Sequence, residues 1–304
     1  MKVRLFSRPI IGLYIICIII AIFYYMNRTE RFINVPSDTA VVCVLHPGAG
    51  FFSEFFFLCK VYLFAKEKNY PFFIEHDNWQ YTYEKGWHDY FITLNDFKDD
   101  GQFKEIKRYR AHISEDIPEY SIKQYIECIK EIFILNDTLK RRVDDFTKKL
   151  EGNYTSLYIR RGDKVNEMPL ISIDEILGQT NIKDDGRTIF LQTDDFSAVT
   201  DIKNRFRSCN VMTLTPDNKG GAHNAHMVTW TPEQRKNETE ELLVSCSIFV
   251  QATQGWSYYH SNVGTFHKLF GYDRIKLYID NTHTRESVDN VYKLEYKGPP
   301  YALI

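Results

Sequence analysis

One apolar segment of the chain runs directly into a dense group of charged side chains. Residues 156–161 read SLYIRR, and Gly-Asp-Lys-Val-Asn-Glu follows, so two arginines, two acids and a lysine fall within residues 160–167. A guanidinium group is a planar fork that fits phosphate oxygens, a lysine adds a point charge, and a nearby carboxylate can act as a general base. The alternative interpretation is a solvated strand end with ordinary salt bridges.

Two other places carry side chains suited to chemistry. Gln192-Thr-Asp194-Asp195 also ends an apolar segment, and its paired carboxylates suit a metal or a hydroxylated ligand, or merely cap the helix that follows. His46-Pro-Gly48-Ala-Gly50 is a glycine turn that lets backbone N–H groups approach an anion at a helix N-terminus. The turn is neither a G-x-G-x-x-G motif nor a P-loop, which argues against a dinucleotide-binding protein or an ATPase.

Composition and absent motifs exclude several classes of protein. The 304 residues carry 38 basic and 40 acidic side chains and 44% hydrophobic residues, so the chain is globular and has no global positive field for nucleic acid. The six cysteines form no C-x-x-C pair or zinc-ligand spacing, and they indicate neither a metal site nor a disulfide scaffold. G-x-S-x-G, H-E-x-x-H and Asp-x-Asp are also absent.

The elements that must position these groups alternate along the chain. Strands separated by helices of 10–15 residues are typical of parallel βαβ units, so we predict an α/β protein with two Rossmann-like lobes that meet near residue 150. In such folds ligands bind beyond the carboxyl ends of the strands. We expect strands at 40–46, 71–75, 156–161, 188–193, 210–214, 248–253 and 275–280. We expect helices at 51–69, 121–150 with a break near Asn136, 172–178, 196–207, 231–247 and 260–270, and an irregular segment at 76–118.

The N-terminus contains a long apolar run. Residues 9–26 have no charged side chain, and as a helix they would span about 27 Å, close to the ~30 Å of a bilayer core. A cleaved signal peptide would have a shorter run followed by small residues, whereas this run leads into Phe23-Tyr-Tyr-Met-Asn-Arg28; a buried helix is the third alternative. We therefore expect a signal anchor through the lipid bilayer, and the positive charges before it place the N-terminus in the cytosol.

This topology predicts a single-pass type II membrane protein with a luminal (Golgi- or ER-type) or extracytoplasmic body. Four glycosylation sequons, at Asn27, Asn136, Asn153 and Asn237, are compatible with that compartment. The predicted parts are a cytosolic tail at 1–8, the anchor at 9–26, a stem at 27–40, an N-terminal lobe on the acceptor side at 41–150, and a nucleotide-sugar-binding lobe at 151–304.

The order of the blocks resembles that of the α-1,6-fucosyltransferase family, which includes core fucosyltransferases and rhizobial Nod-factor fucosyltransferases. In that family a glycine turn follows the first strand, and the signature His-Val-Arg-Arg-Thr/Gly-Asp-Lys-Val is similar to residues 158–165. Its Asn-Trp-Arg-Tyr block is similar to residues 78–81, where Gln80 stands in place of the arginine. A Thr-Asp-Asp after a strand is similar to residues 193–195. The resemblance implies a GT-B-like fold.

The resemblance also implies roles for residues. Arg160 would hold the β-phosphate of GDP-fucose, and Glu240 would bind the guanine edge. Glu167 would deprotonate the acceptor hydroxyl with Lys164 beside it, and Asp195 is the alternative base. The donor-binding residues that the resemblance implies are Arg160, Arg161, Gly48, Gly50, Tyr158, Asp194, Glu240, Thr253 and Ser257. Such enzymes are inverting and need no metal, because fixed cations stabilise the leaving diphosphate.

We therefore expect a membrane-anchored inverting fucosyltransferase that moves L-fucose from GDP-fucose to a glycan or glycoprotein acceptor. Two alternatives stay open. One is a glycosyltransferase that uses another nucleotide sugar on the same fold. The other is a non-catalytic sugar-binding or receptor ectodomain, in which aromatic residues such as Trp79, Trp87 and Trp256, rather than the phosphate-side residues, would carry binding.

Overall fold

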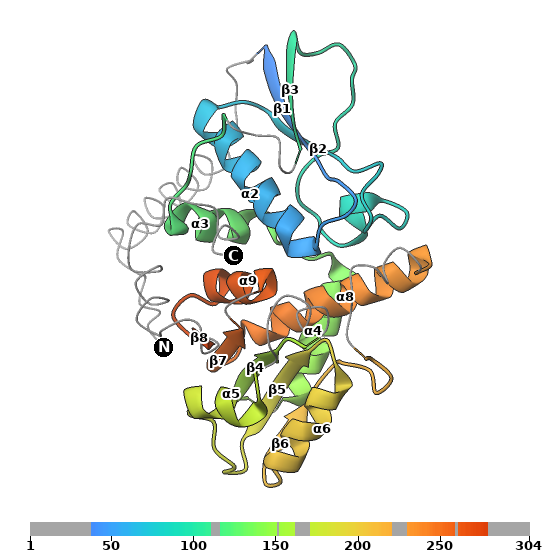
Figure 1. The fold of residues 1–304 in the computed structure, drawn as a ribbon. Helices are drawn as coiled ribbons and strands as arrows, with labels where there is room; N and C mark the ends of the chain where they lie inside the picture. Colours follow the sequence, from blue (N-terminus) through green and yellow to red (C-terminus); the bar gives the residue numbers. More distant parts are fainter. Residues whose placement is uncertain are drawn as a thin grey trace, which may run out of the picture. The chain divides into compact units, whose positions relative to one another are not determined.

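The computed structural model describes residues 38–110, 116–150, 152–161, 171–220, 230–258 and 261–278. The expected tail, anchor and most of the stem lie outside these residues. Within the described part, no helix combines the length and apolar character needed to cross a membrane. The described residues from Thr39 to Tyr278 belong to one compact unit that contains two parallel sheets (Figure 1).

The first sheet has three strands in the order β2-β1-β3. Their bounds are β1 Thr39–Val44, β2 Phe72–Glu75 and β3 Glu105–Arg110. Both pairings are parallel, and β1 is apolar and buried because it lies at the centre and is covered by helix α2, Phe51–Lys68. Strand β3 was not predicted, since its sequence EIKRYR is charged and partly exposed, as suits the edge of a sheet.

The second sheet has five strands in the order β6-β5-β4-β7-β8. Their bounds are β4 Tyr154–Ile159, β5 Thr188–Thr193, β6 Asn210–Met212, β7 Gln254–Tyr258 and β8 Ile275–Tyr278. Every pairing is parallel, so all five carboxyl ends meet at one edge. The predicted α/β class with parallel strands is confirmed.

The helix bounds are α3 Ile122–Ile132, α4 Asp137–Lys149, α5 Ile173–Gln179, α6 Phe196–Arg205, α8 Pro232–Phe249 and α9 Asn262–Phe270, with a 3-10 turn η2 at Gly86–Asp89. Helices α3, α4, α5, α6 and α8 each begin after a polar residue whose side chain caps them. Asn136 caps α4 by accepting from the backbone N–H groups of Thr138 and Leu139, which confirms the predicted break between α3 and α4.

The predicted strand at 248–253 is wrong. Helix α8 continues through Phe249, and the strand begins only at Gln254. Of the predicted strand, Ile248 and Phe249 are the buried last residues of α8, and the residues from Val250 to Thr253 connect α8 to β7. A helix covered on every side has no amphipathic pattern, so a short apolar run does not distinguish it from a buried strand.

Aromatic side chains fill the space between α2 and α9. The ring centroids of Phe52 on α2 and Phe266 on α9 are 4.4 Å apart, and those of Phe133 and Phe266 are 4.7 Å apart. Because Phe52 lies in the first turn of α2 and Phe266 in the middle of α9, the contact brings the start of α2 against α9 (Figure 1).

Candidate active site

Charged side chains meet at the carboxyl edge of the five-stranded sheet. Arg160 follows β4, and Asp194 follows the adjacent strand β5. The guanidinium of Arg160 donates to Asp194 Oδ2 at 2.6 Å, and the backbone N–H of Arg161 donates to Asp194 Oδ1 at 2.8 Å. Asp194 is buried, whereas 18% of the Arg160 side chain is exposed. Asp194 therefore fixes the direction of a cation that solvent still reaches.

Two further predicted site residues, Arg161 and Asp195, attach helix α6 to this edge. Arg161 donates to Ser197 Oγ and to Asp201 Oδ2, both at 2.7 Å. The carboxylate of Asp195 accepts the backbone N–H of Ser197 at 2.8 Å and caps α6. In this structure the side chains of Arg161 and Asp195 both act on α6, whereas the guanidinium of Arg160 contacts Asp194.

Ser261 was missed by the sequence analysis. It lies directly before α9, on the strand-to-helix connection next to β4, and its hydroxyl is 3.3 Å from that of Tyr158 rather than capping its own helix. The hydroxyl of Tyr278, at the end of β8, donates to the carbonyl of Tyr158 at 2.8 Å. Burial raises the pKa of Tyr158, so its hydroxyl stays protonated. A serine before an apolar helix was the available signal, but the helix was predicted to begin at His260, which placed Ser261 inside it.

Gly264 brings α9 into close contact with β7. A Cβ at this position would lie 1.9 Å from the carbonyl oxygen of Tyr258 and 3.3 Å from Ser257 Oγ. Only a residue without a side chain fits, so the first turn of α9 lies directly against the end of β7. The partial positive charge of that turn is thereby placed at the edge that carries Arg160.

Ser257 lies beneath this edge rather than on it. Its side chain is fully buried, and its hydroxyl is 2.9 Å from Nδ1 of His267 on α9. The imidazole stacks on Phe249 with a centroid distance of 3.8 Å, and burial lowers its pKa well below the usual 6.5. Ser257 and His267 therefore attach α9 to the sheet as neutral partners.

Thr253 lies at the amino edge of the five-stranded sheet, whereas it was expected among the donor-binding residues at the carboxyl edge. It precedes β7, and its hydroxyl donates to the carbonyl of Tyr154 at the start of β4, at 2.8 Å. The structure therefore does not bring Thr253 to the edge of Arg160. The misplaced strand at 248–253 is the reason for the difference.

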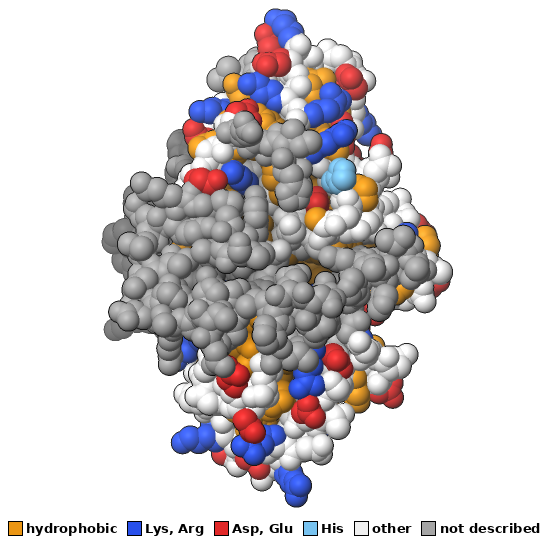
Figure 2. Space-filling view, in the orientation of Figure 1, with side chains coloured by type: hydrophobic (Ala, Val, Ile, Leu, Met, Phe, Trp, Pro, Cys, Tyr) orange, Lys and Arg blue, Asp and Glu red, His pale blue; other side chains and the backbone are white. Residues whose placement is uncertain are grey.

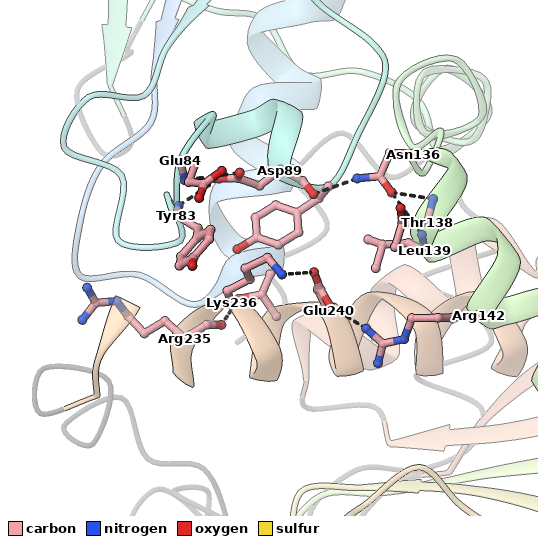
Figure 3. Close-up of polar contacts among 12 residues, drawn as sticks. Tyr83, Glu84, Asp89, Asn136, Thr138, Leu139, Arg142, Arg235, Lys236 and Glu240 are labelled. Atoms are coloured by element: carbon pink, nitrogen blue, oxygen red, sulfur yellow. Dashed lines mark hydrogen bonds and ion pairs between the residues drawn. The ribbon is translucent and has the colours of Figure 1, made fainter. Parts of the chain in front are cut away.

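Glu240 is held by two cations on the face of α8 (Figure 3). Its carboxylate accepts from Arg142 of α4 at 2.5 Å and from Lys236, one turn earlier on α8, at 2.8 Å. The Lys236 ammonium is also 5.3 Å from the ring centroid of Tyr83. In this structure Glu240 therefore joins α4 to α8. Its side chain, which was expected to bind the guanine edge, is paired with Arg142 and Lys236 instead.

A second ion cluster attaches the chain after β6 to α8. Lys219 lies 2.6 Å from Glu238 and 2.8 Å from Glu241. Burial raises the pKa of Glu241, and the two carboxylates raise the pKa of Lys219 against the effect of its own burial. Lys219 also accepts the N–H of Phe196 through its carbonyl, so this cluster reaches the start of α6.

The glycine turn follows β1 at the carboxyl edge of the three-stranded sheet. Gly48 has a φ of 108°, a conformation that glycine adopts without strain, and Gly50 immediately precedes α2. Glu54 in the first turn of α2 is buried and accepts the backbone N–H of His46 at 3.2 Å. Burial raises the pKa of Glu54.

The remaining predicted site residues, Glu167 and Lys164, lie outside the described residues. Among the residues that are described, no cluster of three or more His, Cys, Asp or Glu side chains could hold a metal ion. On the face drawn in Figure 2, basic and acidic side chains of the described part are interspersed rather than gathered by sign.

Comparisons with known proteins place this geometry in context. No protein-family model and no curated protein matches the sequence. Among solved structures, the fucosyltransferase NodZ from Bradyrhizobium matches with a TM-score of 0.55 and 10% identity over 80% of this chain and 97% of that chain. NodZ α-1,6-fucosyltransferase soaked with GDP-fucose matches with a TM-score of 0.51 and 11% identity over 76% of this chain and 92% of that chain. A variant of FUT1 from Arabidopsis thaliana in complex with GDP matches with a TM-score of 0.51 and 8% identity over 86% of this chain and 76% of that chain. The described part of this chain therefore has the fold of these fucosyltransferases.

Proposed function

We propose that this chain is an inverting glycosyltransferase that transfers L-fucose from GDP-fucose to a hydroxyl group of a glycan acceptor. The observation that carries the proposal is the guanidinium of Arg160, which is fixed by buried Asp194 and lies at the same sheet edge as the first turn of α9. This is the place where α/β folds bind nucleotides. Solved structures of the same fold contain GDP-fucose or GDP.

The mechanism is a single displacement at the anomeric carbon. An acceptor oxygen forms a bond to that carbon while the bond from the carbon to the diphosphate oxygen breaks, and GDP leaves with both bonding electrons. Arg160 and the backbone N–H groups that open α9 stabilise the negative charge on the diphosphate. The acceptor proton passes to Glu167, with Lys164 beside it. Because fixed cations supply the charge, the reaction proceeds without a metal ion.

The proposed setting is the luminal side of a membrane. Residues 9–26 anchor the chain in the bilayer, and the body acts on glycans or glycoproteins in a Golgi- or ER-type compartment. The uncharged apolar run and the basic side chains that precede it support this setting.

A transferase that uses another nucleotide sugar is the second candidate. Two observations on residues that were expected to bind the donor favour this candidate. The Tyr158 hydroxyl lies against Ser261 within the protein, and Glu240 is paired with Arg142 and Lys236. Neither side chain is offered to a guanine in this structure, so the identity of the base rests on other residues.

Calorimetric titration of the whole protein with GDP, UDP and CMP, without added metal, tests the proposal. We expect selective binding of GDP, and in Arg160→Ala a loss of at least tenfold, since a charge-assisted hydrogen bond contributes about 1.5–3 kcal/mol. Arg205→Ala is the matched control, because it removes an exposed arginine of α6 whose partner is Asp174. Preference for UDP would support the second candidate. A folded protein that binds none of the three would overturn the enzyme assignment.

A further inference from the structure

The side chain of Gln80 forms two hydrogen bonds with one stretch of the glycine turn. The backbone N–H of Gly48 donates to Gln80 Oε1 at 3.3 Å, and Gln80 Nε2 donates to the carbonyl of Ala49. The amide orientation follows from these partners, because the reverse assignment would place two donors and two acceptors against each other. The hydroxyl of Tyr81 donates to the same Ala49 carbonyl at 3.1 Å.

These bonds determine the direction of the next backbone N–H. A trans peptide is planar, and its C=O and N–H point in opposite directions. Since Gln80 and Tyr81 draw the Ala49 carbonyl toward themselves, the N–H of Gly50 points away from them. Gly50 is the residue that opens α2, so this N–H is added to the donors of the first turn of that helix.

The residues around Gln80 are buried and closely packed. Trp79 and Tyr81 on either side are buried, and Phe51 of α2 contacts both rings with centroid distances of 5.7 and 5.3 Å. The hydroxyl of Tyr90 donates to the carbonyl of Tyr81 at 2.7 Å. An anchored backbone can hold a side-chain amide in one position, which a mobile loop could not.

We propose that Gln80 is a positioning residue for the donor diphosphate: its amide fixes the Ala49–Gly50 peptide so that the turn presents an N–H, not a carbonyl, to the negative charge. This inference rests on the proposed function. The contact of Phe52 with Phe266 packs the first turn of α2, which follows the glycine turn directly, against α9, the helix whose first turn opens at the edge of Arg160. If the peptide turned over, its carbonyl dipole would repel the same phosphate that Arg160 attracts.

The test compares GDP with guanosine as calorimetric ligands of the whole protein. Gln80→Met removes both hydrogen bonds without changing charge, and we expect at least tenfold weaker binding of GDP and unchanged binding of guanosine. Gln80→Asn is a second variant, because its amide is one methylene too short to span both partners, and we expect the same pattern. Gln102→Met, at an exposed position of the same lobe, is the control.

The outcomes separate this inference from the proposed function. If wild-type protein binds GDP, Arg160→Ala abolishes binding and both Gln80 variants bind GDP as wild type does, the inference is wrong and the proposed function stands. An equal loss for GDP and guanosine, or a loss that follows a lower unfolding temperature, would also overturn it, since either indicates a general structural role. Failure of the wild-type protein to bind GDP would overturn both.

Discussion

Replacing Gly264 with alanine tests how closely the first turn of α9 must lie against β7. The new Cβ would begin 1.9 Å from the carbonyl oxygen of Tyr258, whereas real Cβ atoms essentially never lie closer than 3.0 Å to another heavy atom. The helix or the strand must therefore move by at least 1.1 Å, the difference between these two distances. The obstacle is backbone, which cannot turn aside as a flexible side chain can.

The expected cost has two parts. Forcing extra volume into a packed contact costs about 1–3 kcal/mol. Because the obstacle is backbone, we take the upper part of this range, about 2–3 kcal/mol. Alanine recovers up to about 1 kcal/mol by its higher helix propensity, so we expect the free energy of unfolding to fall by at least about 1–2 kcal/mol. Movement of this size at the opening of α9 also misaligns the proposed phosphate contacts, so we expect GDP to bind at least tenfold more weakly.

The assay is urea denaturation together with calorimetric titration of GDP. Gly178→Ala is the matched control, because Gly178 lies in α5 with no heavy atom within 4 Å of its would-be Cβ. We expect this control to be as stable as wild type or slightly more stable, with unchanged GDP binding. The reasoning is refuted if Gly264→Ala matches wild type in both stability and affinity.

Three further predictions concern the charges around the site. Asp194→Asn should weaken GDP binding about tenfold in calorimetric titration, because it removes the charge-assisted bond that fixes Arg160. The control variant Asp201→Asn should bind GDP as wild type does. His267 is buried and neutral, so below about pH 6.5 the unfolded state takes up a proton that the folded state does not. The free energy of unfolding should then fall by up to about 1.4 kcal/mol per pH unit in urea denaturation, and a decline that persists in His267→Gln would contradict this. Lys219→Met should lower the free energy of unfolding by about 1–3 kcal/mol by leaving two carboxylates without their cation, and Lys219→Met/Glu241→Gln should be more stable than Lys219→Met alone.

Much of the second sheet was predictable because its strands are apolar and end in polar residues. The segments that form β4, β5 and α6 were placed within two residues at their starts, and the charged cluster after β4 correctly marked the carboxyl edge. Asn136 was a readable signal for the break before α4, since a side-chain amide can cap a helix.

What could not be predicted depended on contacts between distant segments. Residues 248–253 read as a strand because they begin with a short apolar run, whereas Ile248 and Phe249 are the buried end of α8 and the strand begins only at Gln254. This error moved Thr253 to the wrong edge. Glu240 was read without its partner Arg142, which is 98 positions away in the sequence. The amide of Gln80 likewise acquires its role only where the fold brings it to the glycine turn.

Hydrogen–deuterium exchange of the whole protein, with and without GDP, tests the central claim most directly because it locates the ligand on the chain. The account predicts slower exchange in two segments upon addition of GDP, residues 158–161 at the end of β4 and residues 261–265 at the start of α9. Arg160→Ala should remove both effects at the same GDP concentration. Slower exchange confined to other segments, or none at concentrations that saturate binding, would contradict the claim that this edge of the five-stranded sheet holds the diphosphate.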